Sequence, residues 1–258
     1  MKKWLIAFYL SFTALSFAGS KTDHITYEWL TTPGDGYTHY IVHFKKIFQL
    51  TKIKTLLEFG MGMGTKYFLD KCNKVLSIDF ITHGYGPGPF QSYLDLYQEC
   101  PNWIPIAYFS GYQGNFPSWA PYKYLASEHV YKACTYQTVT HKNYALIDDF
   151  YRTELDSFIK SLTKCHNIDC AFLHPTLFLR GDLIELLFSQ VPIIIATETN
   201  CRQAGEENDV YGYSRLRVSH AYEEIFLPGD SGMTLWITKK ESYAPLIKAL
   251  KKYAASFN

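Results

Sequence analysis

Short apolar runs alternate with amphipathic helical stretches along most of the chain. The run VPIIIAT at residues 191–197 is continuous, which is typical of a strand covered on both faces of a sheet. Alternation of this kind predicts an α/β fold: a Rossmann-like, doubly wound and mostly parallel sheet with helices on both faces. The predicted strands are residues 53–59, 74–80, 103–109, 168–174 and 191–197, and the helices are 64–72, 144–162, 180–190 and 243–255.

Other segments depart from this alternation. Residues 222–240 read as two strands joined by a Pro-Gly-Asp-Ser-Gly turn, which predicts a C-terminal antiparallel hairpin at one edge of the sheet. Residues 23–51 predict one or two helices before the core. Residues 83–90 contain two prolines and three glycines and predict a loop. Residues 110–142 are rich in aromatic side chains and predict an irregular segment, either packed over the sheet or covering an acceptor.

A glycine turn follows the first predicted strand. The stretch LLEFGMGMGT places Gly60, Gly62 and Gly64 between that strand and a helix. Glycine allows a tight turn and close approach of a ligand, and the helix directs unpaired N–H groups toward it. Asp79 ends the next strand, and in a parallel sheet the two strand ends are neighbours. The Asp79 carboxylate is therefore placed to accept hydrogen bonds from both hydroxyls of a ribose.

The spacing of the glycines discriminates among cofactors. A dinucleotide fingerprint requires G-x-G-x-x-G or A, whereas this chain has G-x-G-x-G followed by Thr65. A P-loop is excluded because no G-K-[ST] closes the turn. Glu58, in the strand itself, would repel a phosphate and instead suits a cofactor that carries positive charge.

The two segments LLEFGMGMGT and VLSIDF together resemble the first two motifs of class I S-adenosylmethionine-dependent methyltransferases. The resemblance covers roughly residues 40–240 in the order of predicted elements. It implies S-adenosylmethionine as cofactor, with the glycine turn against its methionine part and the acid after the second strand on its ribose. The matching positions are Glu58, Gly60, Gly62, Gly64 and Asp79.

The acceptor half departs from the family pattern, in which acids follow the fourth and fifth strands. His174 stands where an aspartate is expected, and Glu198 and Asn200 follow the fifth strand. One hypothesis makes His174 a general base for an acceptor hydroxyl or amine, with Glu198 as the second catalytic residue. A divalent metal held by His174, Glu198 and Asn200 is a lesser alternative. In a purely structural interpretation, these residues only terminate strands, and Arg180 and Asp182 are ordinary residues at the start of a helix.

The N-terminus has the pattern of an export signal. Lys2 and Lys3 precede an apolar run at residues 4–17, and Ser16-Phe17-Ala18 offers a cleavage site. We therefore expect a signal peptide at residues 1–18 and a single domain at residues 19–258, periplasmic or secreted. An uncleaved signal that anchors the chain to the inner membrane is the alternative. No second long apolar run follows, so no stable membrane span is expected after signal removal.

The six cysteines all follow this segment. In an exported chain they permit up to three disulfides, and the short spacing of Cys165 and Cys170 would allow one across a small loop. No CxxC pair occurs, so neither a thioredoxin-like site nor a zinc knuckle is indicated. The cysteines are Cys72, Cys100, Cys134, Cys165, Cys170 and Cys201.

These observations favour S-adenosylmethionine-dependent methyl transfer to a small hydroxylated or amino acceptor. The alternative is a non-catalytic exported binding protein that keeps the fold. Net charge is +1, which gives no indication of a nucleic-acid partner or an anionic membrane. The sequence GDSG at residues 229–232 resembles the surroundings of a serine-protease nucleophile, but the α/β pattern favours a hairpin turn.

Overall fold

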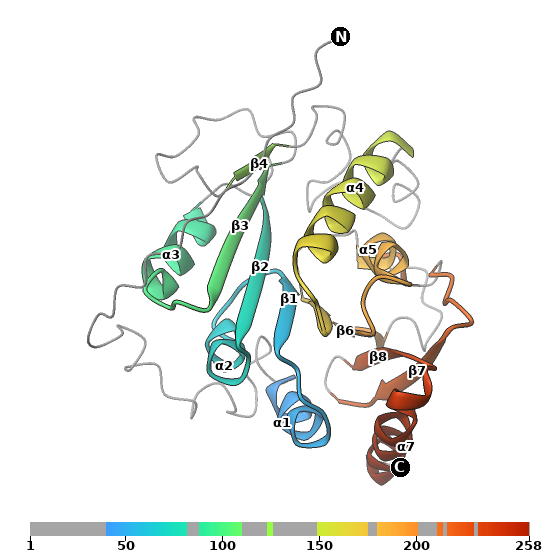
Figure 1. The fold of residues 1–258 in the computed structure, drawn as a ribbon. Coiled ribbons are helices and arrows are strands. Elements are labelled where there is room, and N and C mark those ends of the chain that lie inside the picture. The colour runs from blue at the N-terminus through green and yellow to red at the C-terminus, as the bar shows by residue number, and fades with distance from the viewer. Residues whose placement is uncertain are drawn as a thin grey trace.

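An eight-stranded sheet organises the computed structural model (Figure 1), which describes residues 40–81, 88–109, 123–125, 149–174, 180–200, 211–213, 216–229 and 232–257. The strand order is β4-β3-β2-β1-β5-β6-β8-β7. The strands are β1 (Thr55–Phe59), β2 (Lys74–Ile81), β3 (Trp103–Phe109), β4 (Lys123–Leu125), β5 (Cys170–Leu173), β6 (Ile193–Thr197), β7 (Tyr222–Leu227) and β8 (Met233–Thr238).

The sheet is parallel except at one edge. β1 pairs in parallel with both β2 and β5, and β5 pairs in parallel with β6. β8 runs antiparallel to its neighbours β6 and β7. The chain first builds outward from β1 through β2 and β3, and then returns to build outward through β5 and β6. The doubly wound sheet and the C-terminal hairpin predicted from the sequence are therefore confirmed, and the reversal lies between β1 and β5.

Helices cover both faces of this sheet (Figure 1). Neighbouring residues of β1 point to opposite sides: Leu56 belongs to one buried cluster and Leu57 to the other. The first cluster includes residues of α1, α2, α3 and α7, and the second includes residues of α4 and α5. The helices are α1 (Ile41–Leu50), α2 (Thr65–Lys71), α3 (Gly88–Tyr97), α4 (Asp149–Cys165), α5 (Arg180–Leu187) and α7 (Ala244–Ala254), with 3-10 turns at Glu241–Tyr243 and Ala255–Phe257.

Two local expectations were wrong. Residues 83–90 were expected to form a loop, but α3 begins at Gly88. Pro89 therefore lies in the first helical turn, where its missing N–H needs no partner and its fixed φ suits a helix. The segment expected to be irregular also contributes the short parallel strand β4, which pairs with β3. Three residues carry too little periodicity to reveal a strand in the sequence.

Several expectations concern residues outside the described part of the chain. These are the signal peptide at residues 1–18, most of the aromatic segment at 110–142, Cys134 and Cys201. Cys165 and Cys170 are both free thiols, so they do not form the short bridge that their spacing permits, and Cys72 is a free thiol as well. None of the described helices has both the length and the apolarity needed to cross a bilayer.

Candidate functional site

The predicted site residues gather at the carboxyl edge of the parallel strands. The glycine turn leaves the end of β1, Asp79 lies near the end of β2, and His174 and Glu198 directly follow β5 and β6. Backbone hydrogen bonds join these ends. The His174 N–H donates to the Phe59 carbonyl at 3.0 Å, and the Gly60 N–H donates to the Ile78 carbonyl at 2.8 Å. Ligands of doubly wound sheets bind at this edge, beside the strand where the order reverses.

The glycine turn is held from inside by hydrogen bonds. Gly60 has a φ of +83°, a conformation that glycine adopts without steric cost. The Gly62 N–H donates to the Thr65 hydroxyl oxygen at 2.9 Å. From α3, the Tyr97 hydroxyl donates to the Gly62 carbonyl at 3.2 Å. The turn is thus preorganised by the first residue of α2 and by a side chain of α3.

Glu58 belongs to this internal support. Its side chain is buried, and its carboxyl oxygens accept hydrogen bonds from the Ser77 hydroxyl at 2.7 Å and the Thr65 hydroxyl at 3.0 and 3.1 Å. The Ser77 oxygen in turn accepts a hydrogen bond from the Trp103 indole N–H at 3.0 Å. Burial raises the pKa of Glu58 to about 8, against the lowering effect of the Ser77 and Thr65 hydrogen bonds. The structure therefore places Glu58 beneath the turn, and its direct contact with a cofactor stays a prediction.

Asp79 is a second buried acid, at the end of the neighbouring strand. Its carboxylate accepts a hydrogen bond from the Phe80 N–H at 3.1 Å, and among the described residues this is its one hydrogen-bond donor. Burial raises the pKa of Asp79 to about 7. A buried carboxyl group with remaining lone pairs gains free energy from a ligand that donates hydrogen bonds to it. This arrangement fits a ribose diol.

His174 is oriented by its neighbours. Its ring stacks on that of Phe172, with centroids 6.0 Å apart and planes 3° apart. Its Nδ1 lies 2.6 Å from the hydroxyl oxygen of Thr197, at the end of β6. A hydrogen bond at one ring nitrogen fixes the ring plane and directs the other nitrogen, Nε2, away from that partner.

Glu198 is held by a buried arginine. Its backbone has a φ of +57°, a left-handed conformation that costs a non-glycine residue free energy and is concentrated at functional sites. A carboxylate oxygen lies 2.7 Å from a guanidinium nitrogen of Arg180. That guanidinium stacks 3.7 Å above the Tyr211 ring and also donates to the Thr197 carbonyl at 3.1 Å. Burial opposes ionisation of Glu198, but the charge of Arg180 and a hydrogen bond from Tyr211 keep its pKa below the ordinary value.

The three proposed metal ligands each have another partner in the structure. Glu198 pairs with Arg180, His174 bonds to Thr197, and the Asn200 amide nitrogen contacts the Gly229 carbonyl at 3.4 Å. Within the part of the chain that the structure describes, no group of three His, Cys, Asp or Glu side chains is placed to hold a metal ion.

Comparison with solved structures identifies the fold. A crystal structure from Klebsiella pneumoniae, assigned as an O-methyltransferase, superposes with a TM-score of 0.51 over 88% of this chain and 93% of its own, at 13% identity. The chain has the fold of a class I methyltransferase. An O-methyltransferase from Bacillus cereus in complex with SAH is also similar, with a TM-score of 0.44, 9% identity, and coverage of 82% and 96%. No protein-family model matches the sequence, and no curated protein matches it.

Within this methyltransferase fold, Tyr40 links the two halves of the site, and sequence reasoning missed it. Its hydroxyl lies so close to Gly64 that a Cβ added there would be 2.0 Å away. Its ring lies 4.9 Å from that of His174. Tyr40 is also almost fully buried, at 3% exposure. No pattern around residue 40 signals this role, because the contact depends on how α1 packs against the sheet.

Arg180 was also missed, since a charged residue at a helix start is usually solvated. Here it is 2% exposed and lies beneath the end of β6. Gly181 next to it permits this packing: an added Cβ would lie 2.5 Å from the Gly212 carbonyl oxygen. In the sequence, the only indication that Arg180 is buried was the glycine that directly follows it at the start of a helix.

Proposed function

We propose that this protein transfers the methyl group of S-adenosylmethionine to a small hydroxylated or amino acceptor. One observation carries the proposal: the glycine turn, Asp79 and His174 occupy the same edge of a methyltransferase fold, and the His174 backbone bonds to the end of β1. A donor held on the turn and an acceptor beside His174 would then be adjacent, as in-line transfer requires.

The described residues fit the cofactor. Gly62 opens onto space, because an added Cβ would meet no heavy atom nearer than the Tyr93 hydroxyl at 3.9 Å. Asp79 offers its buried carboxylate to the ribose hydroxyls. When bound, S-adenosylmethionine supplies an activated methyl group on a positively charged sulfur. Among the similar structures, those from Bacillus cereus and from Streptomyces achromogenes (TomG) are complexes with SAH and SAM, respectively.

His174 would act as the general base. With its Nδ1–H donated to the Thr197 hydroxyl oxygen, Nε2 accepts the proton of the acceptor hydroxyl or ammonium group. Glu198 carries a negative charge that interacts electrostatically with His174. This charge stabilises the imidazolium that forms, because an opposite charge nearby favours the protonated ring.

Isothermal titration calorimetry with S-adenosylmethionine and S-adenosylhomocysteine tests the cofactor. Both are expected to bind, and a well-folded sample that binds neither would refute the proposal. A methyl-transfer assay over a panel of catechols, sugars and amines then tests His174→Gln. This variant should retain cofactor binding and lose transfer by roughly 100-fold or more. His220→Gln changes an exposed histidine and is the matched control. This variant should retain both cofactor binding and methyl transfer.

A non-catalytic binding protein that keeps the fold is the second candidate. It is favoured by the acceptor half, where His174 replaces the acid of the related enzymes and Glu198 is locked in an ion pair. The two candidates differ in turnover, and the second does not require S-adenosylmethionine. Cofactor binding with no methyl transfer to any member of the panel would favour this second function.

A further inference from the structure

The first and last described helices pack together into one surface. The His43 ring nitrogen Nδ1 on α1 lies 3.1 Å from the Tyr253 hydroxyl on α7. The Lys46 amine lies 5.9 Å from the centre of the Tyr253 ring. Residues 41–54 and 239–257, at opposite ends of the described chain, therefore share one side of the molecule. We refer to these two segments together as the basic face.

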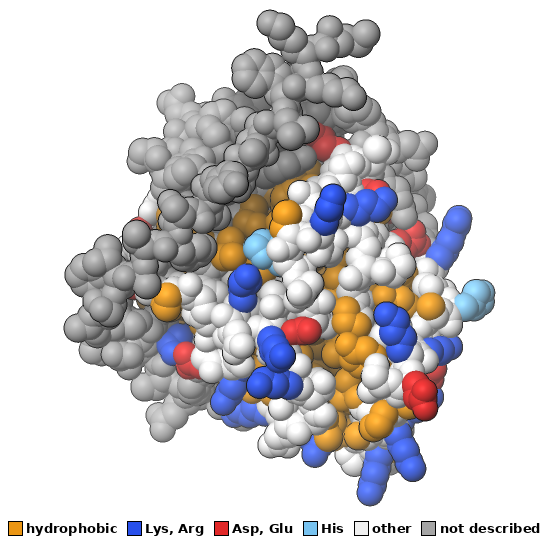
Figure 2. Space-filling model, viewed as in Figure 1, with side chains coloured by type: hydrophobic (Ala, Val, Ile, Leu, Met, Phe, Trp, Pro, Cys, Tyr) orange, Lys and Arg blue, Asp and Glu red, His pale blue; other side chains and the backbone are white. Residues whose placement is uncertain are grey.

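The basic face concentrates positive charge. Its two segments contain nine lysines and one glutamate, although the net charge of the whole chain is only +1. Figure 2 shows Lys and Arg side chains gathered over the lower part of the molecule, where Figure 1 places α1 and α7. Glu223 of β7 pairs with Lys239 and Lys251. Lys45, Lys248 and Lys252 are exposed and have no ion pair with any described carboxylate.

Apolar groups lie within the same charged surface. Among the described residues, the large hydrophobic side chains that are exposed are Val42 on α1, at 52%, and Phe257 after α7, at 47%. Phe257 packs on His43, with ring centroids 5.6 Å apart. Exposed apolar side chains on a lysine-rich surface are typical of surfaces that insert into the headgroup region of a membrane.

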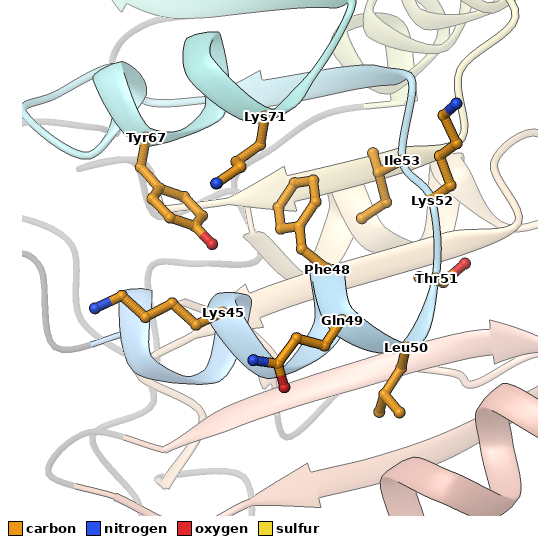
Figure 3. A pocket seen from close by; sticks show the side chains of 9 residues that line it. All are labelled: Lys45, Phe48, Gln49, Leu50, Thr51, Lys52, Ile53, Tyr67 and Lys71. Atoms are coloured by element: carbon orange, nitrogen blue, oxygen red, sulfur yellow. The ribbon is translucent and has the colours of Figure 1, made fainter.

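A hollow of about 790 Å³ extends this face between α1 and α2. In Figure 3, the Lys71 amine and the Tyr67 hydroxyl point into the space beside the Phe48 ring. Ile53, which precedes β1, lines the same hollow. The hollow is thus at the amino end of β1, whereas the glycine turn is at its carboxyl end. Three lysines and no acid line it: Lys45, Lys52 and Lys71.

We propose that the basic face docks on an anionic phospholipid bilayer. Each lysine near such a surface contributes favourably, and the exposed Val42 and Phe257 can insert into its headgroup region. In the alternative of an uncleaved anchor, the apolar run at residues 4–17, upstream of α1, would also bring the basic face to a membrane.

Co-sedimentation of the full chain with vesicles tests this proposal. Vesicles of phosphatidylcholine alone are compared with vesicles that also contain about 30% phosphatidylglycerol. Insertion of the apolar run contributes to binding of both kinds, so the difference between them measures charge-dependent binding. The full chain should prefer the anionic vesicles, and this preference should weaken at high salt. The triple variant Lys45→Gln, Lys248→Gln and Lys252→Gln should lower the anionic partition coefficient by roughly 100-fold.

The control removes three charges elsewhere. The triple variant Lys160→Gln, Lys164→Gln and Arg217→Gln should bind anionic vesicles nearly as the unmodified chain does. Equal loss in both variants, or equal binding of the unmodified chain to both kinds of vesicle, would overturn the proposal. Binding to single-stranded RNA that matches or exceeds binding to anionic vesicles would overturn it as well, because it would assign the charge to a different partner.

Discussion

At the residue scale, Glu58 supports the glycine turn from beneath. Its carboxyl group connects the hydroxyls of Thr65 and Ser77 beneath the glycine turn. Its pKa of about 8 means that the group is mostly protonated at neutral pH. A proton shared in this buried network avoids the cost of an isolated charge in the interior. The hydrogen bonds of Glu58 therefore support the geometry of the turn.

This protonation predicts a pH dependence of stability. The folded-state pKa of Glu58 is raised from 4.5 to about 8, so the folded protein holds a proton that the unfolded chain releases between these values. The stabilisation that comes from protonated Glu58 is therefore fully present below about pH 4.5. It decreases as the pH rises through 8, by up to about 1.4 kcal/mol per pH unit. Glu58→Gln, which mimics the protonated group, should reduce this decrease in urea unfolding midpoints. An unchanged pH profile would contradict the assignment.

Asp79 predicts a pH dependence of binding. Its pKa in the unliganded protein is raised to about 7, and the ionised form is the better acceptor for ribose hydroxyls. Affinity for S-adenosylhomocysteine should therefore increase as the pH rises through about 7. Asp79→Asn should weaken binding by roughly 10- to 100-fold and flatten this increase, because Asn cannot ionise. Titration calorimetry at several pH values measures both, and a variant with the same slope as the unmodified protein would exclude Asp79 from the ribose site.

At the scale of elements, the start of α1 packs against the glycine turn. Tyr40, at its start, contacts Gly64, whereas Gly62 faces open space. The two glycines of one motif therefore differ in their surroundings: Gly64 allows close packing between elements, and Gly62 leaves room for the approach of a ligand.

Substitution of each glycine by alanine separates these reasons. Gly64→Ala should lower the free energy of unfolding by about 1–3 kcal/mol, because the new methyl group would overlap the buried Tyr40 ring. Gly62→Ala should leave stability within about 1 kcal/mol of the original and instead weaken cofactor binding. Chemical denaturation and calorimetry measure the two effects. Equal destabilisation by both variants would show that the packing argument is wrong.

The ion pair of Arg180 and Glu198 joins α5 to the end of β6. Arg180→Met should cost about 2–4 kcal/mol, since it leaves the partly buried Glu198 charge without its partner. Combining it with Glu198→Gln should recover part of this loss. The exposed pair of Lys160 and Asp156 on α4 is the control, and its double-mutant cycle should give a coupling below about 0.5 kcal/mol. Additive losses at Arg180 and Glu198 would refute their coupling.

At the scale of the whole molecule, we propose that the chain is exported. The charged N-terminus, apolar run and cleavage site support this proposal, and so does the absence of any later long apolar run from the sequence. Mass spectrometry of the protein from its native envelope fraction should find a mature N-terminus close to residue 19. An intact Met1 on a cytoplasmic protein would contradict export, whereas an intact Met1 in the membrane fraction would favour the uncleaved anchor.

The sequence predicted most of the architecture because the signals for it are local. Apolar runs of strand length, helical periodicity and the glycine turn each depend on a few consecutive residues. Strand β4 and the start of α3 were missed because a three-residue strand has no period and because proline is tolerated in a first helical turn. Asp79 could be placed beside the turn because parallel neighbours bring their carboxyl ends to the same edge.

By itself, the sequence thus determined the doubly wound sheet, the hairpin and the position of the glycine turn next to Asp79. Only the tertiary structure decided that Tyr40 lies on Gly64, that Arg180 is buried against Glu198, and that lysines from both ends of the described chain form one face. The physical reason is sequence separation. Contacts between distant residues depend on how helices cross the sheet and pack, and no local pattern of residues encodes that geometry on its own.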